Sequence, residues 1–216
     1  MNQKTSIGLL DSITSEGIIS LGSDFLELAL DNNLNEGVLR EIPVVKNLYS
    51  LGRATVAIYH RLLINKMINF LGELSNVSYE KRQSFVEDFD KNPQKKRVFE
   101  ETLLLLIDSA DSLEKPSIVG RLFKHYILGK ISYEDAMRLS YIVNRVYMSD
   151  LNYLTSFTSG IQSNPDIAAS LQSAGLLKLA LSMDFGYLGE PSPAGIIYEL
   201  NDYGKMLLQY GLDSAV

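Results

Sequence analysis

Apolar side chains recur at the three- and four-residue spacing of an α-helix from Ile18 to Leu154, and this periodicity restricts the fold more than any other feature. Proline, glycine and Asn-Pro pairs divide the pattern into segments of ordinary helix length. One long stretch of apolar residues at helical spacing starts at Pro43. A second stretch, between Pro116 and Gly129, predicts a single helix. The sequence therefore predicts a mainly α protein, a helical bundle with helix over more than half of the chain.

A different pattern follows near the end of the chain. Two short apolar runs, LLKLALSM and GIIYEL, flank a loop rich in Gly and Pro, and the second run is rich in residues that favour strands. Asn201 or Asp202 stands where it would cap a closing helix. We expect one β-hairpin within about residues 177–200, in a small winged-helix-like C-terminal subdomain.

Three regions are predicted along the chain. Residues 1–40 form an N-terminal helical segment, residues 41–160 the helical body, and residues 161–216 the winged-helix-like subdomain. The polar spacer TSFTSGIQSNP marks the second of these boundaries.

The composition is that of a globular protein. The 216 residues are 46% hydrophobic and 21% charged, and the chain contains no cysteine, which excludes disulfides and thiolate metal sites. The N-terminus lacks the pattern of a signal peptide, and charges interrupt the most apolar stretch before it is long enough to span a bilayer. We expect a cytoplasmic protein with no membrane span.

Charge is distributed unevenly. Residues 1–40 carry two basic and six acidic side chains, a net charge of -4, and residues 147–216 carry two basic and seven acidic, a net of -5. Residues 41–146 carry sixteen basic and thirteen acidic side chains, a net of +3. Any binding of nucleic acid is therefore expected through the middle region only.

The hairpin is not expected to read DNA. The stretch NPDIAASLQSAG, which would be the recognition helix, has no Lys or Arg, and neither has the loop DFGYLGEPSPAG. Neutralisation of phosphates by cations dominates affinity for DNA, so a duplex would meet a surface of its own sign.

Basic side chains of the middle region form a candidate site for nucleic acid or an acidic partner. Its residues are Arg121, Lys124, His125, Arg138 and Arg145, which the spacing places on the polar sides of two successive helices, and the run KKR at 95–97 adds further charge. The alternative, a solvated face that neighbouring acids balance, is favoured by the usual exposure of such residues.

Evidence for catalysis is sparse. Arg53 and His60 match the loose Arg-x4–6-His motif of HEPN ribonucleases, which are also all-helical, but the spacing is easily met by chance. The stretch DFDKNPQKKRVFEE begins like a calcium loop but has proline where glycine is needed, so calcium is rejected. We expect no metal, no nucleotide and no other cofactor, and Arg53 and His60 remain the only catalytic candidates.

Three segments occur in the order EIPVVKNLYSLGRATVAIYHRLLINKMINFL, EKPSIVGRLFKHYILGKISYEDAMRLSYIVNRVYMSDLNYL and YELNDYGKMLLQYG. In this order the chain resembles uncharacterised bacterial and prophage helical proteins, loosely similar to the abortive-infection alpha group. The resemblance spans roughly residues 40–211 and implies a mostly helical chain with a winged-helix-like end. It also implies a setting in phage–host conflict, and it supplies no catalytic residue.

These observations lead to one main functional expectation. The chain is expected to be a non-enzymatic protein-interaction or regulatory protein, in phage defence or counter-defence, with a protein partner of unknown identity. The alternatives are a nucleic-acid-binding regulator that uses the basic middle, and a HEPN-like ribonuclease. A homo-oligomer is also expected, because the apolar stripe of residues 1–40 must be buried against the body or a second copy, and the copy is slightly favoured.

Overall fold

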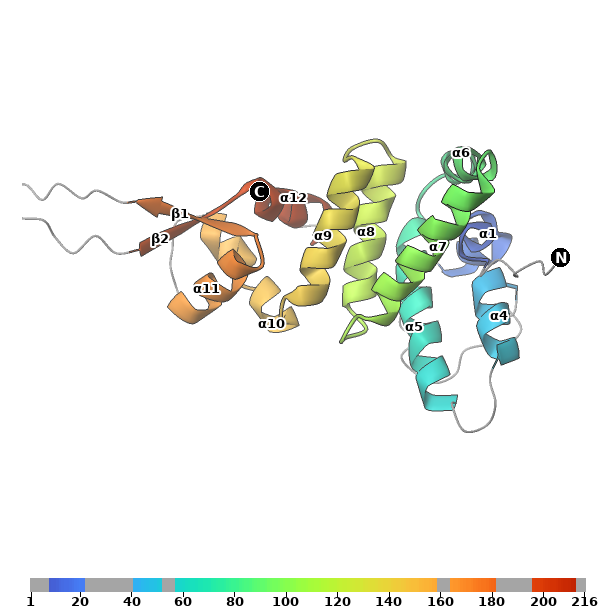
Figure 1. Ribbon diagram of the computed structural model, residues 1–216, viewed down its shortest axis with the longest axis horizontal. Coiled ribbons are helices and arrows are strands. Elements are labelled where there is room, and N and C mark those ends of the chain that lie inside the picture. Colours follow the sequence, from blue (N-terminus) through green and yellow to red (C-terminus); the bar gives the residue numbers. More distant parts are fainter. Residues whose placement is uncertain (1–7, 22–40, 52–56, 159–163, 182–195, 213–216) are drawn as a thin grey trace, which may run out of the picture. The chain divides into compact units, whose positions relative to one another are not determined.

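The structure, a computed structural model, describes residues 8–21, 41–51, 57–158, 164–181 and 196–212. It divides into two compact units, residues 1–136 and 137–216. The first contains α1 (Leu9–Thr14), the 3-10 helix η1 (Glu16–Leu21), α4 (Pro43–Leu51), α5 (Ala57–Leu74), α6 (Tyr79–Asp90), α7 (Pro93–Asp108) and α8 (Lys115–Ile127) (Figure 1). Helix α9 (Tyr133–Arg145) begins in the first unit and ends in the second, which continues with α10 (Met148–Leu151), η3 (Leu154–Thr158), α11 (Pro165–Ser173), β1 (Leu177–Leu181), β2 (Ile196–Leu200) and α12 (Asp202–Tyr210).

Polar residues set the starts of several helices. Asn92, Asn164 and Asn201 each accept a hydrogen bond from a backbone N–H in the first turn of α7, α11 and α12, at 3.0, 3.0 and 2.9 Å. Ser132 caps α9, because its hydroxyl accepts from the Asp135 N–H at 3.0 Å and donates to the Asp135 carboxylate.

A close contact between α5 and α8 organises the first unit. A Cβ atom added at Gly120 on α8 would lie 2.6 Å from the Phe70 carbonyl oxygen and 2.8 Å from the Glu73 Cβ on α5, so only glycine allows this approach. Beside it, the buried rings of Phe70 and Phe123 meet edge to face with their centroids 5.8 Å apart.

Aromatic rings fill the space that α6, α7 and α8 enclose. The Phe99 ring of α7 lies 5.9 Å from Phe85, 4.5 Å from Phe89 and 6.0 Å from Phe123, measured between centroids. Phe85 and Phe89 are four residues apart on α6 and so share one face of that helix. The apolar residues that recur at helical spacing in the sequence thus form the buried faces of these helices.

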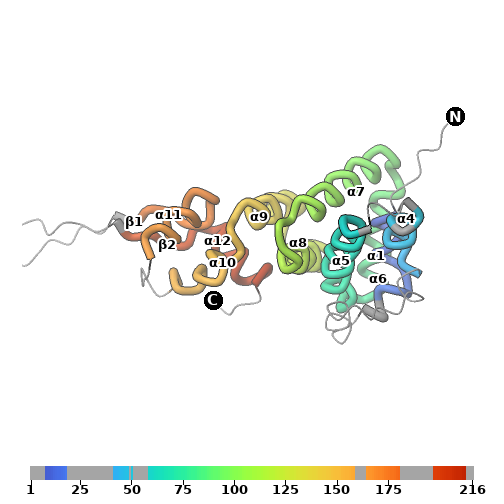
Figure 2. The backbone as a smooth tube through the Cα atoms, turned by 90° about the horizontal axis from the view of Figure 1, so that it is seen from below, coloured from blue at the N-terminus to red at the C-terminus, as the bar shows by residue number. Residues whose placement is uncertain are grey.

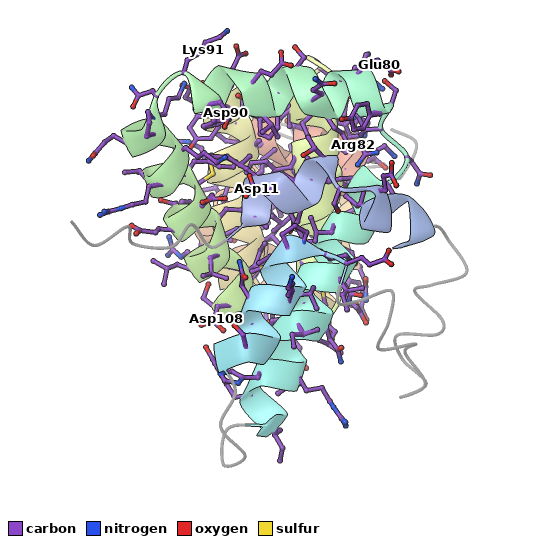
Figure 3. The ribbon with its side chains drawn as sticks, turned by 90° about the vertical axis from the view of Figure 1, so that its right-hand side faces the viewer. Asp11, Glu80, Arg82, Asp90, Lys91 and Asp108 are labelled. Atoms are coloured by element: carbon purple, nitrogen blue, oxygen red, sulfur yellow. The ribbon has the colours of Figure 1, made fainter. Side chains whose placement is uncertain are left out.

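Helix α1 is held at both ends by side chains from other helices. The buried Glu100 carboxylate accepts from the Leu10 N–H at 3.0 Å, and the buried Arg82 guanidinium donates to the Ile13 carbonyl at 2.6 Å. In Figure 3, Arg82 lies toward one end of α6 and Asp90 toward the other, with Asp11 of α1 on the Asp90 side. A six-residue helix is unstable alone, so these contacts and its buried apolar face hold it.

Ser12 connects α1 to α4. Its hydroxyl donates to the Gly8 carbonyl at 2.6 Å and accepts from the Val44 N–H at 2.8 Å, and that N–H is one of the donors left unpaired at the start of α4. Figure 2 shows α1 between α4 and α6, and α1 contacts both helices.

The second unit is built around one antiparallel hairpin. Leu177 pairs with Leu200 and Leu181 with Ile196, and α11 packs on β1 while η3 and α12 pack on β2. Gly175 ends α11 with a φ of 90°, a left-handed conformation that favours glycine. The Asn201 side-chain amide donates to the Gly175 carbonyl at 2.7 Å, and a Cβ at Gly204 would collide with the Leu176 carbonyl oxygen.

The predicted fold class is confirmed: the chain is mainly helical, with a two-stranded antiparallel sheet inside residues 177–200. The division into units differs from the predicted boundary at 160/161. The helices before that boundary belong with the hairpin, because η3 packs on β2 and α12, and α10 packs on α11.

The N-terminal segment also differs from expectation. Leu9, Leu10, Ile13 and Ile18 are buried, and α1 packs on α4, α6 and α7 of the same chain. These residues therefore give no support to burial against a second copy. The remainder of the stripe, at residues 22–40, lies outside the described residues, and the oligomeric state stays a prediction.

Candidate interaction surfaces

The predicted basic residues of α8 are less available than the sequence indicates. Arg121 forms an ion pair with Glu73, with 2.7 Å between Nη1 and Oε1 and side chains only 20% and 15% exposed. Lys124 is half-buried. The expectation that His125 projects from the polar side is wrong: it is 8% exposed, since it lies three residues beyond Leu122 and so falls on the buried stripe.

Neighbouring acids and a ring balance the run at 95–97. Lys96 Nζ lies 3.1 Å from Asp11 Oδ1 and 3.0 Å from Asp90 Oδ1. Arg97 pairs with Glu101 at 3.1 Å, and Lys95 Nζ lies 5.3 Å from the centroid of the Phe89 ring. Burial works to lower the pKa of Lys96, but the hydrogen bonds to Asp90 and Asp11 outweigh it and raise that pKa. For this run the balanced-face interpretation fits the contacts.

Helix α9 presents a different surface. Arg138, Tyr141 and Arg145 are exposed and follow one another at spacings of three and four residues, so they share one face of the helix. We call these three residues the α9 ridge. Within the part of the chain that the structure describes, neither guanidinium of the ridge forms an ion pair.

Aromatic rings accompany the two arginines. The Arg138 guanidinium carbon lies 5.3 Å from the centroid of the Tyr203 ring on α12, within the range of a cation–π contact. Tyr141 is 52% exposed, and Tyr147, two residues beyond the helix, is 68% exposed. The stacking on Tyr203 reduces the freedom of Arg138, and the ridge therefore combines an oriented cation, a large exposed ring and a second cation.

The sequence analysis included Arg138 and Arg145 but missed the tyrosines. Tyr141 could have been found from its spacing to both arginines, whereas Tyr203 comes from a distant part of the chain and has no local signal. Arg121, Lys124 and His125 belong to the first unit, while the ridge belongs to the second. A single surface made of all five predicted residues remains a prediction.

The charges of the described hairpin agree with the expectation that it does not bind DNA. Helix α11 carries Asp166 and no cation, and Lys178 of β1 faces its register partner Glu199 of β2 with 3.7 Å between the charged atoms. The connection at residues 182–195 lies outside the described residues. No cation of the described hairpin is thus left for a phosphate.

The ribonuclease candidates cannot be placed as a pair, because Arg53 lies outside the described residues. His60 of α5 is half-buried, and its Nδ1 has no hydrogen-bond partner among the described residues. Next to it, the Tyr59 hydroxyl donates to Asp108 Oδ2 at 2.6 Å, and this hydrogen bond, with some burial, raises the pKa of Tyr59. Lys66 Nζ donates to the Asp108 carbonyl oxygen at 2.6 Å, so this group fastens α5 to the end of α7.

The described residues contain no group of three or more His, Cys, Asp or Glu side chains that could hold a metal ion. None of their helices has the length and apolar character needed to cross a membrane.

Comparison with known proteins finds no family model, no curated protein and no solved structure that matches this chain. The resemblance to prophage and abortive-infection proteins consequently stays an expectation, and the argument about function rests on the surfaces described above.

Proposed function

We propose that this chain is a non-enzymatic interaction protein that binds a protein partner through the α9 ridge. The observation that supports it most is the exposure of two arginines on either side of an exposed tyrosine, and neither arginine forms an ion pair with any residue that the structure describes. Arginine and tyrosine are enriched at protein–protein interfaces and among the residues that dominate binding energy. Elsewhere in the sequence-predicted site, Arg121 is paired with Glu73, Lys124 is half-buried and His125 is buried.

The test is affinity purification from the native host, followed by mass spectrometry of protein and nucleic acid. The R138E/R145E variant removes the ridge charges, and R97E/K205E is the control, because it makes the same change in net charge at two exposed positions elsewhere. A protein retained by the parent and the control and lost from R138E/R145E supports the proposal. The same set of proteins with all three baits would contradict it.

A nucleic-acid-binding regulator is the second candidate, since cations interleaved with an aromatic side chain also suit a phosphate backbone and its bases. Opposing it, residues 137–216 carry four basic and seven acidic side chains, a net charge of -3 that repels a polyanion. An electrophoretic shift at low salt that R138E/R145E abolishes would favour this candidate over the first.

The biological setting is a separate part of the proposal. A role in phage defence or counter-defence rests on the resemblance of the sequence to prophage proteins, and a cytoplasmic location rests on composition alone. Growth of cells that express the chain, challenged with phage and compared with cells that express R138E/R145E, tests the setting separately from binding.

A further inference from the structure

The ridge has dimensions that define what it can recognise. Arg138 and Arg145 are seven residues apart, which is two turns and about 10.5 Å along the axis of a helix. Tyr141 stands between them and exposes half of its surface. A ligand that satisfies all three side chains must carry two anionic groups at about this separation, with an apolar group between them.

An amphipathic helix has this pattern. Acidic residues at positions i and i+7 of a helix repeat the 10.5 Å spacing, approximately, and residues i+3 and i+4 between them lie on the same face. We infer that the α9 ridge docks an acidic amphipathic helix of its partner, with carboxylates on Arg138 and Arg145 and an aliphatic side chain on Tyr141. The inference rests on the proposed function, because it names the partner's chemistry at the same surface.

Charge favours this ligand over nucleic acid. Carboxylates on a peptide are discrete and can be confined to the face that meets the two arginines, whereas a nucleic acid carries charge along its whole length. The second unit has a net charge of -3, so a continuous polyanion meets repulsion beyond the ridge that a short acidic helix avoids.

The geometry of Arg138 strengthens the argument. Its guanidinium makes a cation–π contact with the Tyr203 ring, which restricts the orientations of the side chain. A planar guanidinium fixed by an aromatic ring still presents its N–H groups at the edge, where a carboxylate is bound by two parallel hydrogen bonds. Less side-chain entropy is then lost on binding than for a free arginine.

The test uses the full-length chain and synthetic fluorescent helices, with binding followed by anisotropy. The first peptide carries Glu at i and i+7 and Leu at i+3 and i+4. An isomer of the same composition places the two Glu on opposite faces, and a third peptide has Gln in place of Glu. Duplex and single-stranded oligonucleotides are included as probes of the other ligand class.

We expect saturable binding of the first peptide and binding about tenfold or more weaker for the two others, because the isomer can turn only one Glu toward the ridge and the Gln peptide has no carboxylate to pair. R138Q/R145Q should weaken it by a similar factor, and R97Q/K205Q should leave it unchanged. Y141A should weaken binding of the first peptide but not of a version with Ser in place of Leu. Circular dichroism of each variant checks that the helices are intact.

Equal binding of the first peptide and its isomer overturns the inference, as does binding of the oligonucleotides alone or of no probe. These failures are distinct from failure of the proposed function. If affinity purification still yields a partner that depends on the ridge, the interaction role stands and only the acidic-helix chemistry is wrong. If no ridge-dependent protein is recovered either, both are wrong.

Discussion

The carboxylate of Glu100 on α7 accepts a hydrogen bond from the backbone N–H of Leu10 at 3.0 Å, across 90 residues of sequence. Arg82 on α6 satisfies the other end of the same helix through the Ile13 carbonyl. A negative group thus lies at the start of α1 and a positive group at its end, the arrangement that the helix dipole favours. Burial lowers the pKa of the Arg82 guanidinium.

Replacing Glu100 with alanine should destabilise the first unit by about 1–3 kcal/mol, because it leaves a buried N–H without its acceptor. Urea unfolding followed by circular dichroism measures the change. Glu101→Ala is the control, since Glu101 is exposed and pairs only with the exposed Arg97, and it should cost under about 0.5 kcal/mol. Equal losses in the two variants would refute the capping role.

Gly204→Ala should destabilise the second unit by about 1–3 kcal/mol, although alanine is the better helix former. The new methyl group would collide with the Leu176 carbonyl oxygen and push α12 away from the turn that follows α11. The measurement is the Tm of Gly204→Ala and of Lys205→Ala in thermal unfolding. The second variant is the control, because Lys205 is an exposed position on the same helix. An unchanged or raised Tm for Gly204→Ala would contradict the close approach.

A double-mutant cycle on Arg121 and Glu73 should give a coupling free energy of about 1 kcal/mol or more, since the pair is short and largely shielded from water. The matched cycle on Lys178 and Glu199, whose side chains are 58% and 53% exposed, should give under about 0.5 kcal/mol. Raising the salt concentration should reduce the second coupling more than the first. The reverse order would show that Arg121 is not held by this pair.

Stability should fall at alkaline pH, in part through Tyr126. Burial raises the pKa of its hydroxyl, and the nearby Tyr133, Glu134 and Asp88 raise it further. Between the ordinary value of about 10 and the higher folded value, the folded state holds the proton more tightly than the unfolded state, so stability declines as pH rises.

The measurement is urea unfolding at about pH 8 and about pH 11, below and above the ordinary tyrosine pKa. Tyr126→Phe should lose less stability between the two than the parent does. Tyr147→Phe, at an exposed position, should behave like the parent. A parent and Tyr126→Phe with the same pH dependence would show that this hydroxyl does not contribute.

Local signals in the sequence account for most of the fold that was predicted. The start of the closing helix at Asn201 depends on contacts within a few residues and was placed correctly. The division into two units depends on packing of η3 against β2 and α12, which no local pattern encodes.

In the candidate site, too, local sequence patterns did not predict contacts between residues that are far apart in the chain. Side-chain charge identified Arg138 and Arg145, but the pairing of Arg121 with Glu73 joins residues 48 positions apart and could not be foreseen. His125 was misjudged because a titratable side chain was assumed to face solvent. Its place three residues after Leu122 was the better guide.

The way α1 is held has a consequence for biosynthesis. Arg82 and Glu100 are translated 69 and 90 residues after the groups they bind on this helix. Until then, Leu9, Leu10 and Ile13 have no apolar surface to cover them, and a helix of six residues does not persist in water. Helix α1 is therefore translated early in its unit but is among the last of that unit's elements to fold, and in the interval the nascent chain exposes these apolar side chains to chaperones.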